Sequence, residues 1–188
     1  MRVLAISGSL REGSFNTALA RAARELAPEG VELELASLAD VPLYNADADG
    51  ERSPEAVREL RTRITEADAV LFITPEYNGS VSGVLKNAVD WASRPAGAAA
   101  LTGKTVAVAG VTTGSYGAVW AQADLRRILG IAGARVLDAD LPVAKTDTKF
   151  DPSGRLIDPA VTERLRSHLE ALIALADPGD PQRLLPAA

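Results

Sequence analysis

VLAISGSLREGSFN, residues 3–16, sets the architecture of the whole chain. Its first four residues are apolar, and Gly8 ends this apolar run. Beyond the loop, apolar residues recur at the spacing of one helix face, namely Leu19, Ala22, Ala23 and Leu26. The chain therefore opens as a strand, a loop rich in glycine and serine, and a helix.

The same alternation of strand and helix continues along the chain. Apolar runs predict buried parallel strands at 69–74 and 105–111, alternating apolar and acidic residues at 31–35 indicate an edge strand, and a last strand is predicted at 135–141. Further helices are predicted at 53–66, 81–93, 118–130 and 158–176, with Ser53 as the N-cap of the first of these. Five strands and five helices in alternation predict an α/β fold, a three-layer sandwich around a five-stranded parallel sheet in strand order 2-1-3-4-5.

One domain accounts for this pattern, because 188 residues is the size of a single domain. We assign residues 1–176 to it and expect 177–188, rich in proline and glycine, to be a mobile tail. In such a sheet, ligands bind beyond the carboxyl ends of the strands, where the strand order reverses. The loops after Ser7, Thr74 and Val111 are therefore the expected site of function.

Reactive side chains are scarce: the sequence has no cysteine and one histidine, His168. Thiol chemistry, cysteine-held metals and disulfides are excluded, and no metal site is expected. His168 lies within the last predicted helix, beside its apolar stripe, and is expected to have a packing or surface role rather than a reactive one. If the protein performs redox or group-transfer chemistry, the reactive group must come from a cofactor.

Charge and hydropathy restrict the partners. The formal net charge is −5, which argues against nucleic acid and anionic membranes as partners. The N-terminal apolar run is too short for a signal peptide, and no stretch reaches the roughly 18 apolar residues of a membrane helix. A cytoplasmic protein is the default expectation.

The first loop, residues 8–17, has the chemistry of a phosphate site. It offers hydroxyls, an amide and the guanidinium of Arg11 at the start of a helix, where backbone N–H groups favour anions. It lacks the motifs of nucleoside triphosphatases and of dinucleotide-binding folds, which leaves a pocket for a terminal monophosphate. The alternative is a solvated turn in which Ser14 is an ordinary N-cap.

The second loop is TPEYNGSVSG, residues 74–83. Its proline, asparagine and glycine favour a turn with outward N–H groups, and Tyr77 offers a flat surface. The alternative is a turn whose tyrosine merely packs. The third loop, TTGSYG at 112–117, reads equally well as a binding loop or as an ordinary loop with an N-cap.

Three segments together resemble the NADPH-dependent FMN reductase family, flavodoxin-like enzymes that include quinone, chromate and azo-dye reductases. They are GSLREGSFN at 8–16, PEYNGS at 75–80 and GVLKNAVDW at 83–91, within a resemblance that covers residues 1 to about 175. The resemblance implies a flavodoxin-like fold with FMN and NADPH as cofactors. A hydride would pass from NADPH to FMN and on to a quinone, free flavin or similar acceptor by a ping-pong mechanism, with no catalytic acid or base from the protein.

The resemblance also implies the site residues. Those that hold the FMN phosphate are Ser9, Arg11, Ser14, Phe15 and Asn16. Those that border the isoalloxazine are Pro75, Glu76, Tyr77, Asn78 and Gly79, with Gly114 and Ser115 along its other edge.

Several points stay open at the level of sequence. The resemblance implies a homodimer or homotetramer, and Trp120, off the apolar stripe of its helix, is either a single exposed aromatic or a subunit contact. The rivals to an enzyme are a flavodoxin-type carrier of single electrons and a phosphate-binding module without a redox role. Arg52 and Arg94 are candidates for the 2′-phosphate contact that would separate NADPH from NADH. The acidic residues near Asp49 are expected to form a solvated loop.

Overall fold

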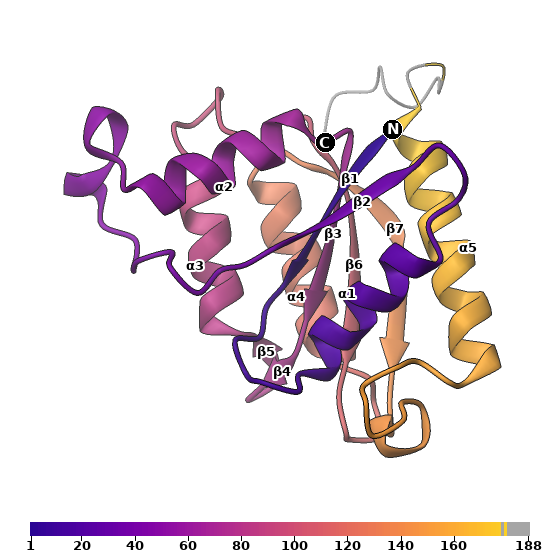
Figure 1. Ribbon diagram of the computed structural model, residues 1–188. Helices are drawn as coiled ribbons and strands as arrows, with labels where there is room; N and C mark the ends of the chain where they lie inside the picture. The colour runs from indigo at the N-terminus through magenta and orange to yellow at the C-terminus, as the bar shows by residue number, and fades with distance from the viewer. Residues whose placement is uncertain (178, 180–188) are drawn as a thin grey trace.

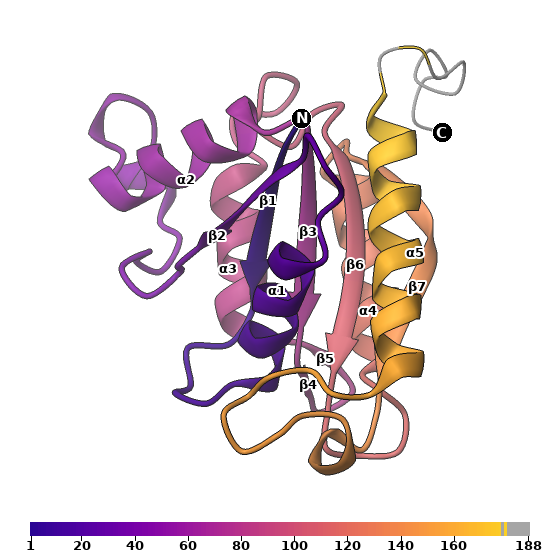
Figure 2. The ribbon, with the colours of Figure 1, turned by 45° about the vertical axis from the view of Figure 1, so that its right-hand side comes forward.

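A five-stranded parallel sheet lies between two layers of helices in the computed structural model, which describes residues 1–177 and 179 (Figure 1, Figure 2). The sheet has the order β2-β1-β3-β6-β7, which confirms the predicted 2-1-3-4-5 arrangement of a flavodoxin-like fold. Its strands are β1 (Arg2–Ser7), β2 (Glu32–Ala36), β3 (Ala69–Thr74), β6 (Thr105–Val111) and β7 (Arg135–Val143). The helices are α1 (Phe15–Glu25), α2 (Glu55–Glu66), α3 (Gly83–Ala92), α4 (Val119–Ile131) and α5 (Pro159–Ala176). Shorter elements are the strands β4 (Glu76–Tyr77) and β5 (Ser80–Val81) and the 3-10 turns Ala46–Ala48, Gly50–Arg52 and Thr146–Thr148.

The central strand β3 shows how the core divides. Every residue of it is buried, and successive side chains point to opposite faces of the sheet. Leu71 and Ile73 join the core beneath α1 and α5, whereas Val70 and Phe72 join the core beneath α2, α3 and α4. Burial on both faces explains why this strand reads as a continuous apolar run.

Parallel pairing brings the three predicted loops to one edge of the sheet. Ser7 is in register with Ile73, Thr74 with Gly110, and Val111 with Val143. The loops after β1, β3 and β6 therefore start side by side at the carboxyl ends of adjacent strands.

Two predicted helix starts and one strand end were wrong. α2 begins after Pro54 with no side-chain cap, and the Ser53 hydroxyl donates instead to the carboxylate of Asp49, at 3.0 Å. α3 begins at Gly83 behind Ser82 as N-cap, because Val81 belongs to a short hairpin. The last strand continues past residue 141 through Pro142, since an edge strand tolerates a residue without an N–H.

The segment between β2 and α2 is held against α3. The indole N–H of Trp91 and the amide of Asn87 both donate to the carbonyl of Pro42, each at 2.8 Å. Asn87 also accepts from the N–H of Tyr44, whose ring meets that of Trp91 edge-on at 4.9 Å between centroids. These two α3 residues, part of the segment 83–91, therefore secure a loop that has no partner in the sheet.

Asp49 departs from the expected solvated loop. Its carboxylate accepts from both terminal nitrogens of Arg61, at 2.8 and 3.2 Å, and this guanidinium also donates to the carbonyl of Trp91. The hydrogen bond from Arg61 is the largest cause that lowers the pKa of Asp49 to about 2, so this carboxylate stays ionised at neutral pH. A long-range partner, 12 residues away, thus removes one acid from an otherwise exposed run.

His168 is buried on the inner side of α5, which confirms the packing role. Burial lowers the pKa of its imidazole, and the backbone carbonyl of Val108 acts in the opposite direction.

Within residues 1–177 and 179, no helix is long and apolar enough to cross a membrane. The prediction of a mobile tail at 177–188 falls almost wholly outside the described residues.

Candidate functional site

Helix α1 presents unpaired donors at its start. Ser14 is its N-cap, and its hydroxyl oxygen accepts from the N–H of Thr17 at 3.4 Å. Among the described residues no acceptor serves the N–H groups of Phe15 and Asn16 or the hydroxyl hydrogen of Ser14. Ser14 can therefore both cap the helix and bind a phosphate, because its hydroxyl oxygen accepts from Thr17 while its hydroxyl hydrogen can still donate to an anion.

The side chain of Asn16 is already engaged. Its amide donates to the carbonyl of Val111 and accepts from the N–H of the same residue, both at 3.2 Å. This pair of bonds fastens the start of α1 to the end of β6. A phosphate here would meet the backbone N–H of Asn16 and not its amide.

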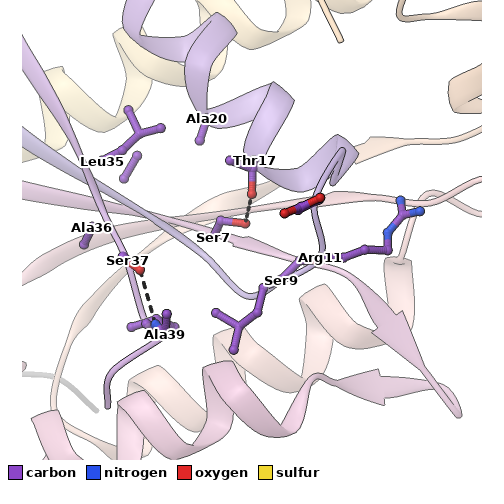
Figure 3. Close-up of a pocket in the computed structure, with 13 residues that line it drawn as sticks. Ser7, Ser9, Arg11, Thr17, Ala20, Leu35, Ala36, Ser37 and Ala39 are labelled. Atoms are coloured by element: carbon purple, nitrogen blue, oxygen red, sulfur yellow. Dashed lines mark hydrogen bonds between the residues drawn. The ribbon is translucent and has the colours of Figure 1, made fainter. Parts of the chain in front are cut away.

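A cavity of about 320 Å³ lies beside the first loop, on the side of β2 (Figure 3). Hydroxyl groups from Ser7, Ser9, Thr17 and Ser37 line it together with apolar side chains, and Arg11 and Glu12 border it. The hydroxyls of Ser7 and Thr17, two of the lining residues, are 3.0 Å apart and hydrogen-bonded (Figure 3). The structure thus brings Ser9 and Arg11 together at a cavity of mixed polar and apolar lining next to the start of α1.

The second loop is a β-hairpin. β4 and β5 pair through Glu76 with Val81 and Tyr77 with Ser80, and the two turn residues Asn78 and Gly79 have φ of 53° and 72°. Asparagine followed by glycine is the usual pair for such a turn, because both positions need a left-handed backbone. The N–H groups of these two residues have no acceptor among the described residues, as the sequence predicts for outward N–H groups.

Tyr77 is 56% exposed at the tip of this hairpin, so its ring does not merely pack against the core. Pro75 links the hairpin to the buried Thr74, whose hydroxyl donates to the carbonyl of Pro75 at 2.7 Å. Glu76 turns toward α4, where its carboxylate accepts from the N–H groups of Trp120 and Ala121 at 3.0 and 3.1 Å. Its side chain is therefore occupied by protein.

The first and second loops are in direct contact. The Ser82 hydroxyl donates to the carbonyl of Gly8 at 2.7 Å. A Cβ on Gly8 would lie 2.9 Å from both the Ser82 hydroxyl and a methyl of Leu85. Glycine at this position is what lets the loop after β1 approach α3 so closely.

The third loop leaves Gly114, Ser115 and Tyr116 exposed, and the Tyr116 ring is 64% exposed. The carbonyl of Gly114 accepts from the N–H of Lys145 at 3.1 Å. Gly117 ends the loop with φ of 63°, and its carbonyl accepts from the amide of the fully buried Gln122 at 2.9 Å. The structure therefore leaves Gly114 and Ser115 accessible on the same edge as the other two loops.

Gln122 and Ser82 were missed at the level of sequence. Gln122 also accepts from the N–H of Leu141 at 3.0 Å, so it connects the third loop to β7. A signal existed, because Gln122 falls on the apolar face that includes Ala118, Leu125 and Leu129, and a polar residue there must find a partner. For Ser82 the signal was its place one residue before Gly83, typical of an N-cap.

In the part of the chain that the structure describes, no group of three or more histidine, cysteine or acidic residues could hold a metal ion.

Comparison with known proteins identifies relatives along nearly the whole chain. The family model described as NADPH-dependent FMN reductase matches residues 1–148. An NAD(P)H-dependent FMN reductase of Pseudomonas aeruginosa is 43% identical over 173 residues, 92% of this chain and 93% of that protein. A quinone reductase of Pseudomonas putida is 40% identical over 172 residues, 91% of this chain and 90% of that protein.

A solved structure agrees with these sequence relatives. The flavoenzyme NAD(P)H:(acceptor) oxidoreductase FerB of Paracoccus denitrificans superposes with a TM-score of 0.81 at 36% identity, covering 93% of this chain and 96% of that one. The resemblance expected from the three loop segments is confirmed: this chain belongs to the NADPH-dependent FMN reductase family.

Proposed function

We propose that this protein is an FMN-containing oxidoreductase that takes a hydride from NAD(P)H and reduces a quinone, free flavin or similar acceptor by a ping-pong mechanism. The observation that carries the proposal is the meeting of three loops at one sheet edge, two of which present unpaired backbone donors. The names of the relatives, FMN reductase and quinone reductase, support the same chemistry. FMN, when bound, supplies the hydride transfer.

The start of α1 would hold the FMN phosphate. The N–H groups of Phe15 and Asn16 and the hydroxyl of Ser14 are donors without acceptors among the described residues, and Ser9 and Arg11 of the same loop line the cavity beside it. A helix N-terminus favours a dianion through its dipole and through these N–H groups together. Arg11 would add a charge-assisted bond that no other cation on this loop can replace.

The hairpin would bind the isoalloxazine edge. The N–H groups of Asn78 and Gly79 have no acceptor among the described residues, and fixed donors of this kind stabilise negative charge on a ring without any proton transfer by a side chain. Pro75, Tyr77 and the third-loop residues Gly114 and Ser115 would complete the walls. We assign no catalytic acid or base.

The nucleotide donor is the less defined partner. Arg94 follows the C-terminal end of α3, about 15 Å along that helix from the hairpin, and its guanidinium lies over the ring of Tyr44 at 5.8 Å. Arg94 remains a candidate for the 2′-phosphate contact. Arg52 is exposed in the segment before α2 and is the other candidate.

The proposal is tested first on the purified protein. Flavin absorbance is expected, followed by its bleaching with NADPH or NADH under anaerobic conditions and its recovery on adding a quinone. A colourless protein that takes up no added FMN would contradict the proposal. A stable blue semiquinone without nucleotide turnover would instead identify a carrier of single electrons.

Arg11→Ala is expected to weaken FMN binding by about 10- to 100-fold, because a hydrogen bond to a charged group contributes roughly 1.5 to 3 kcal/mol. Titration of the apoprotein with FMN, followed by flavin fluorescence, measures the change. Arg21→Ala is the matched control, since Arg21 is exposed on α1 beyond its first turn. Equal affinities in the two variants would exclude the phosphate role of Arg11.

We also propose that the protein assembles as a homodimer or homotetramer through the outer face of α4. Trp120 is 51% exposed there, and its ring meets that of Tyr116 at 5.0 Å between centroids. Arg127, seven positions after Trp120 on α4, is also exposed, and exposed aromatic residues and arginines are typical of interface centres. Sedimentation that shows only monomer at micromolar concentration would refute this assembly.

A further inference from the structure

Helix α4 begins without a cap from its own sequence. Its N-cap position is Ala118, which has φ of 61° and no side-chain hydrogen bond to offer. The first N–H groups of any helix lack partners within the helix and carry a partial positive charge together. At α4 these groups lie directly after the third loop, one wall of the proposed flavin site.

Glu76 supplies the missing acceptor from the neighbouring strand's loop. One carboxylate oxygen accepts from the N–H groups of both Trp120 and Ala121, at 3.0 and 3.1 Å. A second tie lies about one turn further along α4, where the Ser80 hydroxyl donates to the carboxylate of Asp124 at 2.7 Å. Both strands of the hairpin are thus fastened to α4.

We propose that Glu76 is a positioning residue for the flavin ring, acting through α4 rather than by side-chain contact with the cofactor. It fixes the hairpin against α4, and its full negative charge outweighs the partial positive charge at the start of that helix. The proposal rests on the proposed function. Its consequence is that the wild-type site opposes negative charge on the reduced ring more than the backbone donors alone would do.

Two substitutions separate geometry from charge. Glu76→Gln keeps a carbonyl oxygen that can accept from both N–H groups but removes the charge, so it is expected to bind FMN with nearly wild-type affinity and a more positive midpoint potential. Glu76→Ala removes the acceptor, so it is expected to increase amide hydrogen exchange at Trp120 and Ala121 by at least tenfold and to weaken FMN binding. Glu170→Gln, an exposed acid on α5, controls for the change in net charge.

The measurements are the midpoint potential of the FMN-loaded protein and amide exchange of the apoprotein. A potential in Glu76→Gln equal to that of Glu170→Gln would overturn the charge effect. Unchanged exchange in a folded Glu76→Ala protein would overturn the capping. If Glu76→Ala does not fold, wild-type protein in which the amides of Trp120 and Ala121 exchange as fast as unprotected amides would overturn it. The exchange needs no flavin, so failure of the wild type to bind FMN would contradict the proposed function and leave this capping result standing.

Discussion

Gly117→Ala is expected to lower the free energy of unfolding by about 2 to 5 kcal/mol, and to weaken FMN binding because the third loop must move. Gly117 has φ of 63°, a conformation that costs an L-residue roughly 1 to 2 kcal/mol. A Cβ there would lie 2.7 Å from the backbone nitrogen of Val143 and 2.8 Å from the carbonyl carbon of Pro142. Backbone atoms of β7 cannot rotate away, so overpacking adds a further roughly 1 to 3 kcal/mol. Urea unfolding followed by circular dichroism measures the change.

Gly114→Ala is the matched control in the same loop. Its Cβ would have Thr112 Oγ1 as nearest neighbour at 3.6 Å, an ordinary contact, and its φ is not in the left-handed region. Its unfolding free energy is expected to stay within about 0.5 kcal/mol of wild type. If both variants unfold at the same urea concentration, the close approach of Gly117 to β7 does not affect the free energy of unfolding.

Trp91→Ala is expected to cost about 3 to 5 kcal/mol of stability, the usual range for removing a fully buried large aromatic. The indole packs against Tyr44, lies under the guanidinium of Arg61 at 5.7 Å and holds the carbonyl of Pro42. Its loss leaves a cavity under the segment between β2 and α2. Thermal and urea unfolding at fixed protein concentration measure the loss.

Two further variants test that account. Trp91→Phe keeps most of the volume and removes only the N–H, while Asn87 still donates to Pro42, so a loss near 1 kcal/mol is expected. Trp120→Ala removes a half-exposed indole and should change stability of the monomer by less than about 0.5 kcal/mol. A Trp91→Ala variant as stable as Trp120→Ala would show that Trp91 does not anchor this segment.

The fold was predictable because its signals are local and repeated. Strands such as β3 and β6 are apolar on both faces, which is typical of buried parallel strands. Because amphipathic helices alternate with these strands along the sequence, right-handed β-α-β units are predicted. The predicted N-cap of α2 was wrong because the Ser53 hydroxyl donates to the carboxylate of Asp49 and does not cap the helix. That carboxylate is fixed by Arg61 on α2, a partner that local patterns do not indicate.

The site was predictable as three loops but not as a set of contacts. Glycine, serine and asparagine at strand ends indicate turns and anion donors, and the structure has those turns. The direction of individual side chains depends on partners far along the chain, as with Asn16 and Val111, separated by 95 residues, or Glu76 and Ala121, separated by 45. Sequence spacing alone therefore places these residues in the region where the loops meet, without showing that their side chains bind protein.

The two hydrogen bonds between Asn16 and Val111 separate the loop bases, which they hold together, from the loop tips, which they do not hold. They join the base of the first loop to the base of the third, so these two bases can change only together. The exposed stretches 10–13 and 113–116 lie outside that tie. Substitutions in the two loop tips can therefore leave this bond pair, and the loop bases that it joins, in place.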